Sequence, residues 1–300
     1  MAPYKPVRPP ALRPGRYGLL DQIPAPTVED PHELNGITFE DAPCGEATCV
    51  ETFCRTSPAD VPPTKVFDRD YDFPVADPFW VRASDTCSTG GPGHADAGPT
   101  PEGATPIVTG QDKYLERAND VLSFTEGRAV ENTLWTGDCL PAGSDSPFLT
   151  DDTVLGVGDV IQTGTSVPPA YALSLLEDAI CQGAIGMGVI HLPLIAANVL
   201  YSLDLIREEG GGLFTLAGNR VIVGCGYPGT GPGGAIPQPN ATYVYATGPV
   251  LLKRSRPLVI PNRFEEAIDP ETNDVSYAVE RVYLATYSEC GLAAIEMALC

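Results

Sequence analysis

The stretch from Gln111 to Gly137, QDKYLERANDVLSFTEGRAVENTLWTG, constrains the fold most, because it contains no proline in a 300-residue chain with 31 prolines. Its apolar residues recur close to the 3.6-residue period of an α-helix: Leu115, Ala118, Leu122, Ala129 and Leu134. We therefore predict an amphipathic helix of about 20 to 25 residues, roughly 30 to 37 Å long. Gly127 lies inside it and should cost about 1 kcal/mol relative to alanine, and Gly137 can close it in a left-handed conformation.

The chain before this helix is rich in proline and glycine. Residues 1–30 carry seven prolines, which exclude a helix and favour an extended arm that needs another surface to lie on. The aromatic and β-branched run Phe79–Ala83 predicts a strand. Residues 90–103 are dominated by glycine and proline and predict a projecting loop, which usually serves function or assembly.

The chain after this helix alternates between helical and strand patterns. We predict a helix capped at Thr165 or Ser166, with an apolar face of Tyr171, Leu175 and Ala179 that can extend to Leu176 and Ile180. A second helix should begin at Pro193, with the face Ile195, Val199, Leu203 and Ile206, and be stopped by Gly210–Gly212. The expected strands are Met187–Leu192, a pair turning at Ala217–Asn219, Thr242–Leu252, Ser276–Tyr287 and Gly291–Leu299. This order predicts an α+β fold.

Charge is distributed unevenly along the chain. The net charge is −21, yet residues 1–20 contain Lys5, Arg8, Arg13 and Arg16 and no acid, so the remaining 280 residues carry −25. This excess of negative charge after residue 20 argues against direct binding of the chain to the phosphate backbone of a nucleic acid. The basic N-terminus could touch an acidic neighbour or nucleic acid, or remain solvated. Neither a membrane-spanning run nor an apolar signal segment is visible, so we expect no membrane association and synthesis in the cytoplasm.

The cysteine pattern does not indicate a metal site. Cys44, Cys49 and Cys54 are spaced five apart, unlike the short pairs of zinc sites, although His32 and His94 could complete a ligand set. We expect free thiols, which a reducing cytoplasm favours, with disulfides formed after release from the cell as the alternative.

Two segments contain patterns that occur in cofactor-binding or catalytic sites. Gly224–Gly229, GCGYPG, matches a dinucleotide-binding pattern, but Pro228 and Pro232 forbid the helix that must follow it. Cys225 with His191 and Asp204 could form a nucleophile, base and orienting acid. A packed cysteine and a satisfied core histidine explain the same residues. The sequence therefore indicates no cofactor and no metal, and leaves a cysteine-dependent hydrolase as the enzymatic alternative.

Several phrases resemble capsid proteins of actinobacteriophages: RYGLL at Arg16–Leu20, SFTEGRAVENTLWTG at Ser123–Gly137, GVIHLP at Gly188–Pro193 and LAGNRVIVGCGYPGTGP at Leu216–Pro232. The order of arm, projecting loop, long helix and α/β region also resembles the HK97-like major capsid proteins of tailed bacteriophages. A minor capsid protein or an encapsulin-type shell protein of the same fold is the alternative.

The resemblance implies a division of the chain. Residues 1–60 would form the N-terminal arm and 61–110 the extended loop over a neighbouring subunit. The peripheral domain would take 111–165, with the long helix as its spine, and the return strands 251–287. The axial domain would take 166–250 and the C-terminal strand 288–300, with its loop 226–240 pointing to the capsomer centre.

The resemblance also implies pentamers and hexamers that form an icosahedral shell around double-stranded DNA, without sequence-specific contact to that DNA. Scaffolding, portal and decoration proteins would be further partners, and the location would be the virion, after assembly in the host cytoplasm. Residues 66–112 contain no lysine, which argues against the lysine–asparagine cross-link of some members. The implied assembly contacts are Arg8, Arg13, Arg16, Tyr17, Phe79, Trp80, Tyr227 and Pro228.

Overall fold

The computed structural model describes residues 15–39, 75–88, 108–155, 160–161, 165–183, 186–269, 271 and 274–300. The helices are α1 (Leu19–Gln22), η1 (Pro31–Asn35), α2 (Val108–Thr136), α3 (Pro169–Gln182), α4 (Leu194–Ser202), η2 (Pro232–Gly234) and α5 (Phe264–Ala267). The strands are β1 (Ile37–Thr38), β2 (Val75–Ala76), β3 (Pro78–Ser88), β4 (Val189–Pro193), β5 (Ile206–Glu209), β6 (Gly212–Thr215), β7 (Arg220–Gly224), β8 (Ala241–Thr247), β9 (Val250–Arg254), β10 (Leu258–Ile260), β11 (Ile268–Asp269), β12 (Asp274–Tyr287) and β13 (Ala293–Ala298).

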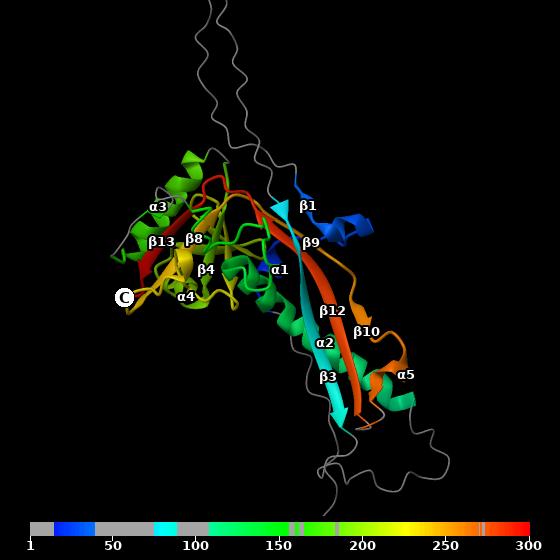
Figure 1. Cartoon of the computed structure of the whole chain (residues 1–300). Helices are drawn as coiled ribbons and strands as arrows, with labels where there is room; N and C mark the ends of the chain where they lie inside the picture. The colour runs from blue at the N-terminus through cyan, green and yellow to red at the C-terminus, as the bar shows by residue number, and fades with distance from the viewer. Residues whose placement is uncertain are drawn as a thin grey trace, which may run out of the picture.

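The helix α2 packs against both large sheets (Figure 1). It lies along the long antiparallel pair β3 and β12, and β9, β10 and β11 pair with the other edge of β12 in succession. Alternate residues of the pair face the helix, so Phe79 lies opposite Tyr283 and their rings stack with centroids 5.9 Å apart. Predictions of a long helix at Gln111–Gly137 and of strands at Phe79–Ala83 and Ser276–Tyr287 are confirmed.

The second sheet has six strands in the order β13-β8-β4-β7-β6-β5. Only β4 and β7 run parallel, as expected when a helix, α4, connects strands of one sheet. One face packs under α3 and α4, with Ile190, Leu192 and Val221 in that core. The opposite face carries Ile222 and Tyr245 into a core shared with α2, so this helix bridges the two sheets.

The helix after Pro193 is shorter than predicted, and the side that it buries is not the predicted one. It ends at Ser202, and residues 206–209 form β5, which turns into β6 through Gly210 and Gly211 at φ of 59° and 88°. Its buried residues are Ala196, Ala197 and Leu200, whereas Ile195 and Leu203 are exposed. The predicted face was wrong because apolar residues occupy both sides of this helix, and the small alanines permit close packing on the sheet.

Two further element boundaries differ from the prediction. The N-cap of α3 is Pro168, not Thr165 or Ser166. Leu176 and Ile180 of the predicted face are buried, together with Leu173, whereas Tyr171 is exposed. The expected strand Thr242–Leu252 is broken into β8 and β9, since residues 248 and 249 are Gly-Pro and proline cannot donate to a sheet ladder.

Gly127 offers a direct test of the α2 assignment. A Cβ atom added there would meet no atom within 4 Å, and the backbone is helical. Gly127→Ala should therefore raise the free energy of unfolding by about 1 kcal/mol, because alanine loses less backbone entropy on folding. Urea denaturation followed by circular dichroism measures the change, and a variant less stable than wild type would contradict a straight, open helix at this position.

Candidate functional site: a buried junction and its surrounding surfaces

A buried carboxylate on α2 holds two distant segments. Glu131 is 4% exposed, and its Oε1 accepts a hydrogen bond from the Leu19 N–H at 3.0 Å while its Oε2 accepts one from the Gly226 N–H at 2.9 Å. Burial raises the pKa of this carboxyl, and the N–H groups of Gly226, Leu19 and Cys225 oppose the rise. No described Lys or Arg pairs with it. Glu131 therefore fixes α1 and the β7–β8 loop to α2 through backbone N–H donors. We call this contact between Glu131, Leu19 and Gly226 the junction.

Aromatic rings fill the space beside this carboxylate. Trp135 is fully buried, with Tyr227 tilted at 4.9 Å and Tyr245 edge-on at 4.8 Å between ring centroids. The Trp135 indole N–H donates to the Thr230 carbonyl at 3.1 Å, and the Tyr245 hydroxyl donates to the same carbonyl at 3.1 Å. The first half of the β7–β8 loop is therefore packed into the molecule rather than projecting from it.

His191 is the polar centre of this core. Its Nδ1 lies 3.0 Å from the Tyr227 hydroxyl, and its Nε2 lies 3.0 Å from Oγ1 of Thr247. The Thr247 hydroxyl donates to the Gly248 carbonyl at 2.9 Å, so its oxygen must accept from Nε2–H, and Nδ1 accepts from Tyr227. The ring is neutral, and burial lowers the pKa of His191 to about 3.

His191 should make the protein sensitive to acid. Its ordinary pKa is 6.5, so between that pH and about 3 the unfolded chain binds a proton that the native chain does not. Stability should fall with decreasing pH over this window, by about 1.4 kcal/mol per pH unit from this group. His191→Gln should flatten the slope between about pH 6 and pH 4, as read from urea unfolding. A His191→Gln variant with the same slope as the wild type would contradict the assignment.

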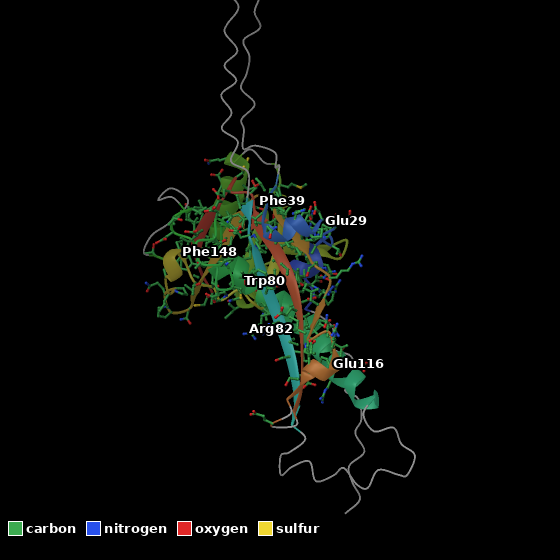
Figure 2. All side chains as sticks on the ribbon, turned by 45° about the vertical axis from the view of Figure 1, so that its right-hand side comes forward. Glu29, Phe39, Trp80, Arg82, Glu116 and Phe148 are labelled. Carbon is green, nitrogen blue, oxygen red and sulfur yellow. The ribbon has the colours of Figure 1, made fainter. Side chains whose placement is uncertain are left out.

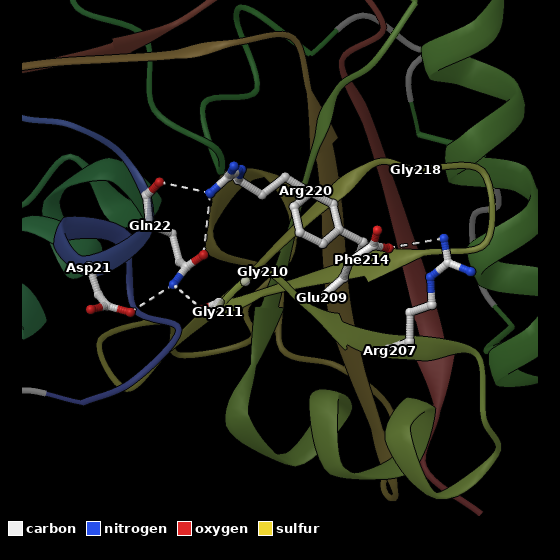
Figure 3. Close-up of a pocket in the computed structure, with 10 residues that line it drawn as sticks. Asp21, Gln22, Arg207, Glu209, Gly210, Gly211, Phe214, Gly218 and Arg220 are labelled. Atoms are coloured by element: carbon white, nitrogen blue, oxygen red, sulfur yellow. Dashed lines mark hydrogen bonds and ion pairs between the residues drawn. The ribbon is translucent and has the colours of Figure 1, made fainter.

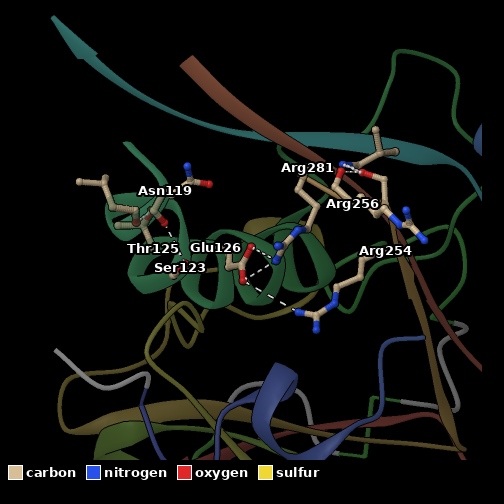
Figure 4. Close-up of polar contacts among 10 residues, drawn as sticks. Asn119, Ser123, Thr125, Glu126, Arg254, Arg256 and Arg281 are labelled. Atoms are coloured by element: carbon tan, nitrogen blue, oxygen red, sulfur yellow. Dashed lines mark hydrogen bonds and ion pairs between the residues drawn. The ribbon is translucent and has the colours of Figure 1, made fainter. Parts of the chain in front are cut away.

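A buried ion pair fastens α2 to the long strands (Figure 4). Both carboxylate oxygens of Glu126 accept from Nη1 of Arg281, at 2.8 and 2.6 Å, and Arg254 lies 4.0 Å away. The side chains of Glu126 and Arg281 are 10% and 15% exposed. Their attraction is therefore weakly screened by solvent, and it links α2 to β12 directly.

The structure places four of the implied assembly contacts on the surface or its margin. Arg16 pairs with Glu208 on β5 and stacks over the ring of Tyr17 at 4.8 Å. Trp80 is 53% exposed on the side of β3 that faces away from α2, where Arg82 also lies (Figure 2). Pro228 is exposed. Arg8 and Arg13 lie outside the described residues.

The other two implied contacts are corrected by the structure. Phe79 is fully buried against Tyr283, and Tyr227 is 5% exposed between Trp135 and His191. Both rings are enclosed by the chain itself and offer no surface to a neighbour. The expectation failed because an aromatic residue in a strand or glycine-rich loop has the same sequence pattern whether it packs inward or outward.

The structure does not support a nucleophilic site. His191 uses both ring nitrogens in the core, whereas Cys225 and Asp204 are exposed, so the proposed base cannot serve that thiol. No cluster of His, Cys, Asp and Glu within the described ranges could hold a metal ion. Cys44, Cys49, Cys54 and His94 lie outside those ranges. None of the described helices is long and apolar enough to span a bilayer.

The cysteines follow the free-thiol expectation in part. Cys139, Cys181, Cys225 and Cys300 are free and exposed. Cys290 is disulfide-bonded, which corrects that expectation at this position.

A cavity of about 590 Å³ lies between α1 and the strands β5, β6 and β7 (Figure 3). Arg220 crosses it, donating to the Gln22 carbonyl at 2.9 Å and lying 5.2 Å from the centroid of Phe214. Asp21, Arg207 and Glu209 complete its polar lining. Acidic and basic side chains both line this open cavity. We interpret it as the space that remains where α1 packs against the sheet.

Sequence reasoning missed the residues that build the junction. Nothing in the sequence separates Glu131 from the solvated acids of α2, because burial of a carboxylate depends on donors that come from residues 19 and 226. Trp135 carried a usable signal, since a tryptophan one residue after a predicted core leucine extends the apolar face of the helix.

No family model and no curated sequence matches the chain. A solved structure from Mycobacterium phage Cain matches with a TM-score of 0.55 at 11% identity, over 94% of this chain and 91% of that one. One from Microbacterium phage Oxtober96 gives 0.51 at 13% identity, over 97% and 95%. The capsid of Ralstonia phage GP4 gives 0.51 at 11% identity, over 99% and 95%.

These matches extend over almost the whole of both chains, so they compare complete architectures and not a shared motif. Because the sequence identities are so low, these matches show that the fold is shared with those proteins, and no more than the fold. The α+β arrangement of a long helix between a β3–β12 layer and a six-stranded sheet, predicted in outline from the sequence, is the HK97-like capsid fold.

Proposed function

We propose that the protein is a major capsid protein of a tailed bacteriophage, which self-assembles into pentamers and hexamers of an icosahedral shell around double-stranded DNA. The observation that carries this proposal is the likeness to the capsid of Ralstonia phage GP4 over 99% of this chain and 95% of that one. It acts by assembly and not by catalysis, and its location is the virion.

The proposed domain boundaries follow the two sheets. The peripheral domain consists of 111–165 and 251–287, which is supported by the packing of α2 on β12. The axial domain consists of 166–250 and 288–300, which is supported by the pairing of β13 with β8. Residues 1–60 act as the arm and 61–110 as the loop over a neighbour. Arg8, Arg13, Arg16, Tyr17, Trp80 and Pro228 remain the proposed contact residues.

The mechanism is multivalent contact. Each arm and loop buries surface on a different neighbour, so weak contacts add through effective concentration. Net charge of −21 keeps the shell wall from binding packaged DNA, which is expected to touch it without sequence specificity. Scaffolding, portal and decoration proteins are the partners that such a shell would recruit. A minor capsid or encapsulin-type role of the same fold is the nearest alternative.

Sedimentation velocity and negative-stain microscopy of the purified chain test the proposal. The full chain should form closed particles far larger than the 31.7 kDa monomer. Deleting residues 1–14 should keep the fold and impair assembly. A longer deletion is unsuitable, because Leu19 is fully buried and its N–H is bound by Glu131. A chain that remains monomeric at all concentrations would overturn the proposal, and normal particles from the truncated chain would overturn the role of the arm.

A further inference from the structure

The short helix α1 is hydrogen-bonded to both ends of β7. The Val223 N–H donates to the Tyr17 carbonyl at 2.9 Å, just before α1 begins. At the other end of the strand, Nη1 of Arg220 donates to the Gln22 carbonyl at 2.9 Å (Figure 3). The β7–β8 loop follows β7 directly, so the position of α1 bears on the place where this loop begins.

The front half of the β7–β8 loop, residues 225–231, is bound to the same carboxylate as α1. Glu131 accepts the Leu19 N–H on one oxygen and the Gly226 N–H on the other. Both segments lie very close to this side chain, since a Cβ atom at Gly18 would be 2.7 Å from Oε1 of Glu131 and one at Gly226 would be 2.8 Å from its Cβ. One buried carboxylate is therefore shared by two segments that are far apart in the sequence.

The back half of the same loop, residues 232–240, is anchored elsewhere. The Gly233 N–H donates to the Thr150 carbonyl at 2.8 Å. The Gln238 N–H donates to Oε1 of Glu296, a buried carboxylate on β13. Neither acceptor belongs to α1 or α2, so a change at α1 has no direct connection to this half.

We propose that Glu131 couples α1 to the front half of the β7–β8 loop, so that displacement of α1 releases the front half and leaves the back half in place. A buried carboxylate is costly unless donors surround it. When the Leu19 N–H leaves, water must enter beside Glu131 to compensate the charge, and this water competes with the Gly226 N–H for the same group. Because linked equilibria are reciprocal, displacement of the front half must loosen α1 by the same factor.

The coupling would connect the N-terminal end of the chain to the loop. Residues 1–14 directly precede this region, so contact between them and a neighbouring subunit would act on α1 and, through Glu131, on the front half. This consequence for assembly rests on the proposed function. The coupling itself is a property of the single chain and can be measured whether or not particles form.

Hydrogen–deuterium exchange of the full-length chain, followed by mass spectrometry, tests the coupling. Leu19→Ala removes a fully buried side chain that holds α1 in place but keeps the backbone N–H. The matched control is Leu122→Ala, the same truncation in the same core. Leu122 is nine residues before Glu131, about 13 Å along the axis of α2, so this variant lowers stability without touching the junction.

We expect Leu19→Ala to accelerate exchange of the Gly226 amide about tenfold. The amides of Gly233 and Gln238 should change less than about twofold, because their acceptors do not move. Leu122→Ala should change the two halves of the loop by the same factor. Equal changes of both halves in Leu19→Ala, or an unchanged Gly226 amide, would overturn the coupling.

Glu131→Gln tests whether the carboxylate carries the effect. The amide has nearly the same size but only one acceptor oxygen, so it cannot satisfy both N–H groups. In this background Leu19→Ala should add less than about a twofold acceleration at the front half. A further tenfold acceleration would instead assign the coupling to the bond between Val223 and Tyr17, and would overturn the role of Glu131.

The reciprocal variant is Pro228→Gly, at an exposed position of the front half. Glycine gives this part of the backbone more freedom, so exchange of the amides in residues 19–23 should also rise. Unchanged exchange there would contradict the coupling. A chain that shows the coupling but stays monomeric would overturn the shell alone, and a closed shell without the coupling would overturn this inference alone.

Discussion

Replacing Gly226 with alanine should lower the free energy of unfolding by about 3 kcal/mol, which is the upper end of the usual cost of overpacking. A Cβ atom at this position would lie 2.2 Å from the Arg128 carbonyl oxygen, 2.8 Å from Cβ of Glu131 and 2.9 Å from the Asn132 nitrogen. Two of these atoms are backbone of α2 and cannot move aside without disturbing its hydrogen bonds. The loop must therefore retreat, which would weaken its bond to Glu131.

Denaturation in urea, with circular dichroism as the signal, measures this effect. Gly127→Ala is the control, since the same added methyl group at this position of α2 meets open space and should raise stability. Opposite signs for the two variants would establish that the β7–β8 loop is pressed against α2. A Gly226→Ala variant as stable as the wild type would show that the loop lies elsewhere.

Replacing Arg281 with methionine should cost about 3 kcal/mol, because it leaves the Glu126 carboxylate buried without its main partner. Arg254, 4.0 Å away and 39% exposed, is too distant to replace two hydrogen bonds of 2.8 and 2.6 Å. The expected loss arises mainly from the stranded charge and only partly from the missing attraction.

The double variant Glu126→Gln with Arg281→Met separates these two causes. Removing both charges should recover most of the stability lost in Arg281→Met alone, since no uncompensated charge then remains. The exposed pair Arg207–Glu209 serves as the control, and Arg207→Met should change stability little. If Arg281→Met behaves like Arg207→Met, the ion pair does not fasten α2 to β12.

Local sequence signals were sufficient for the elements that carry one strong pattern. The proline-free helix α2, the long β-branched and aromatic strand β12, and the turn between β6 and β7 could all be read from the sequence. The resemblance to capsid proteins then supplied the order in which these elements pack. Each of these features depends on residues close together in the chain.

Features that depend on distant partners could not be read in this way. The helix α4 is apolar on both sides, so its period could not tell which side the sheet covers, and Ile195 was assigned inward although it faces out. Tyr227 and Phe79 have the sequence pattern of exposed contact residues but lie in the core. Glu131 looks like a surface acid until the N–H groups of Leu19 and Gly226 are brought to it. In each case the deciding neighbour lies far along the chain.

The helix α2 packs against both sheets and joins them into one core. Its residues Leu122 and Trp135 belong to one continuous core with Tyr283 of β12 and Tyr245 of β8. The two sheets are therefore joined by one continuous core through α2.

Cryo-electron microscopy of particles formed by the purified full-length chain is the most direct test of the capsid function. The expected result is a closed icosahedral shell in which every subunit has the fold described here, with the six-stranded sheets and α4 grouped around the five-fold and six-fold axes. Fields of dispersed monomers, or assemblies whose subunits do not close into a shell, would contradict it.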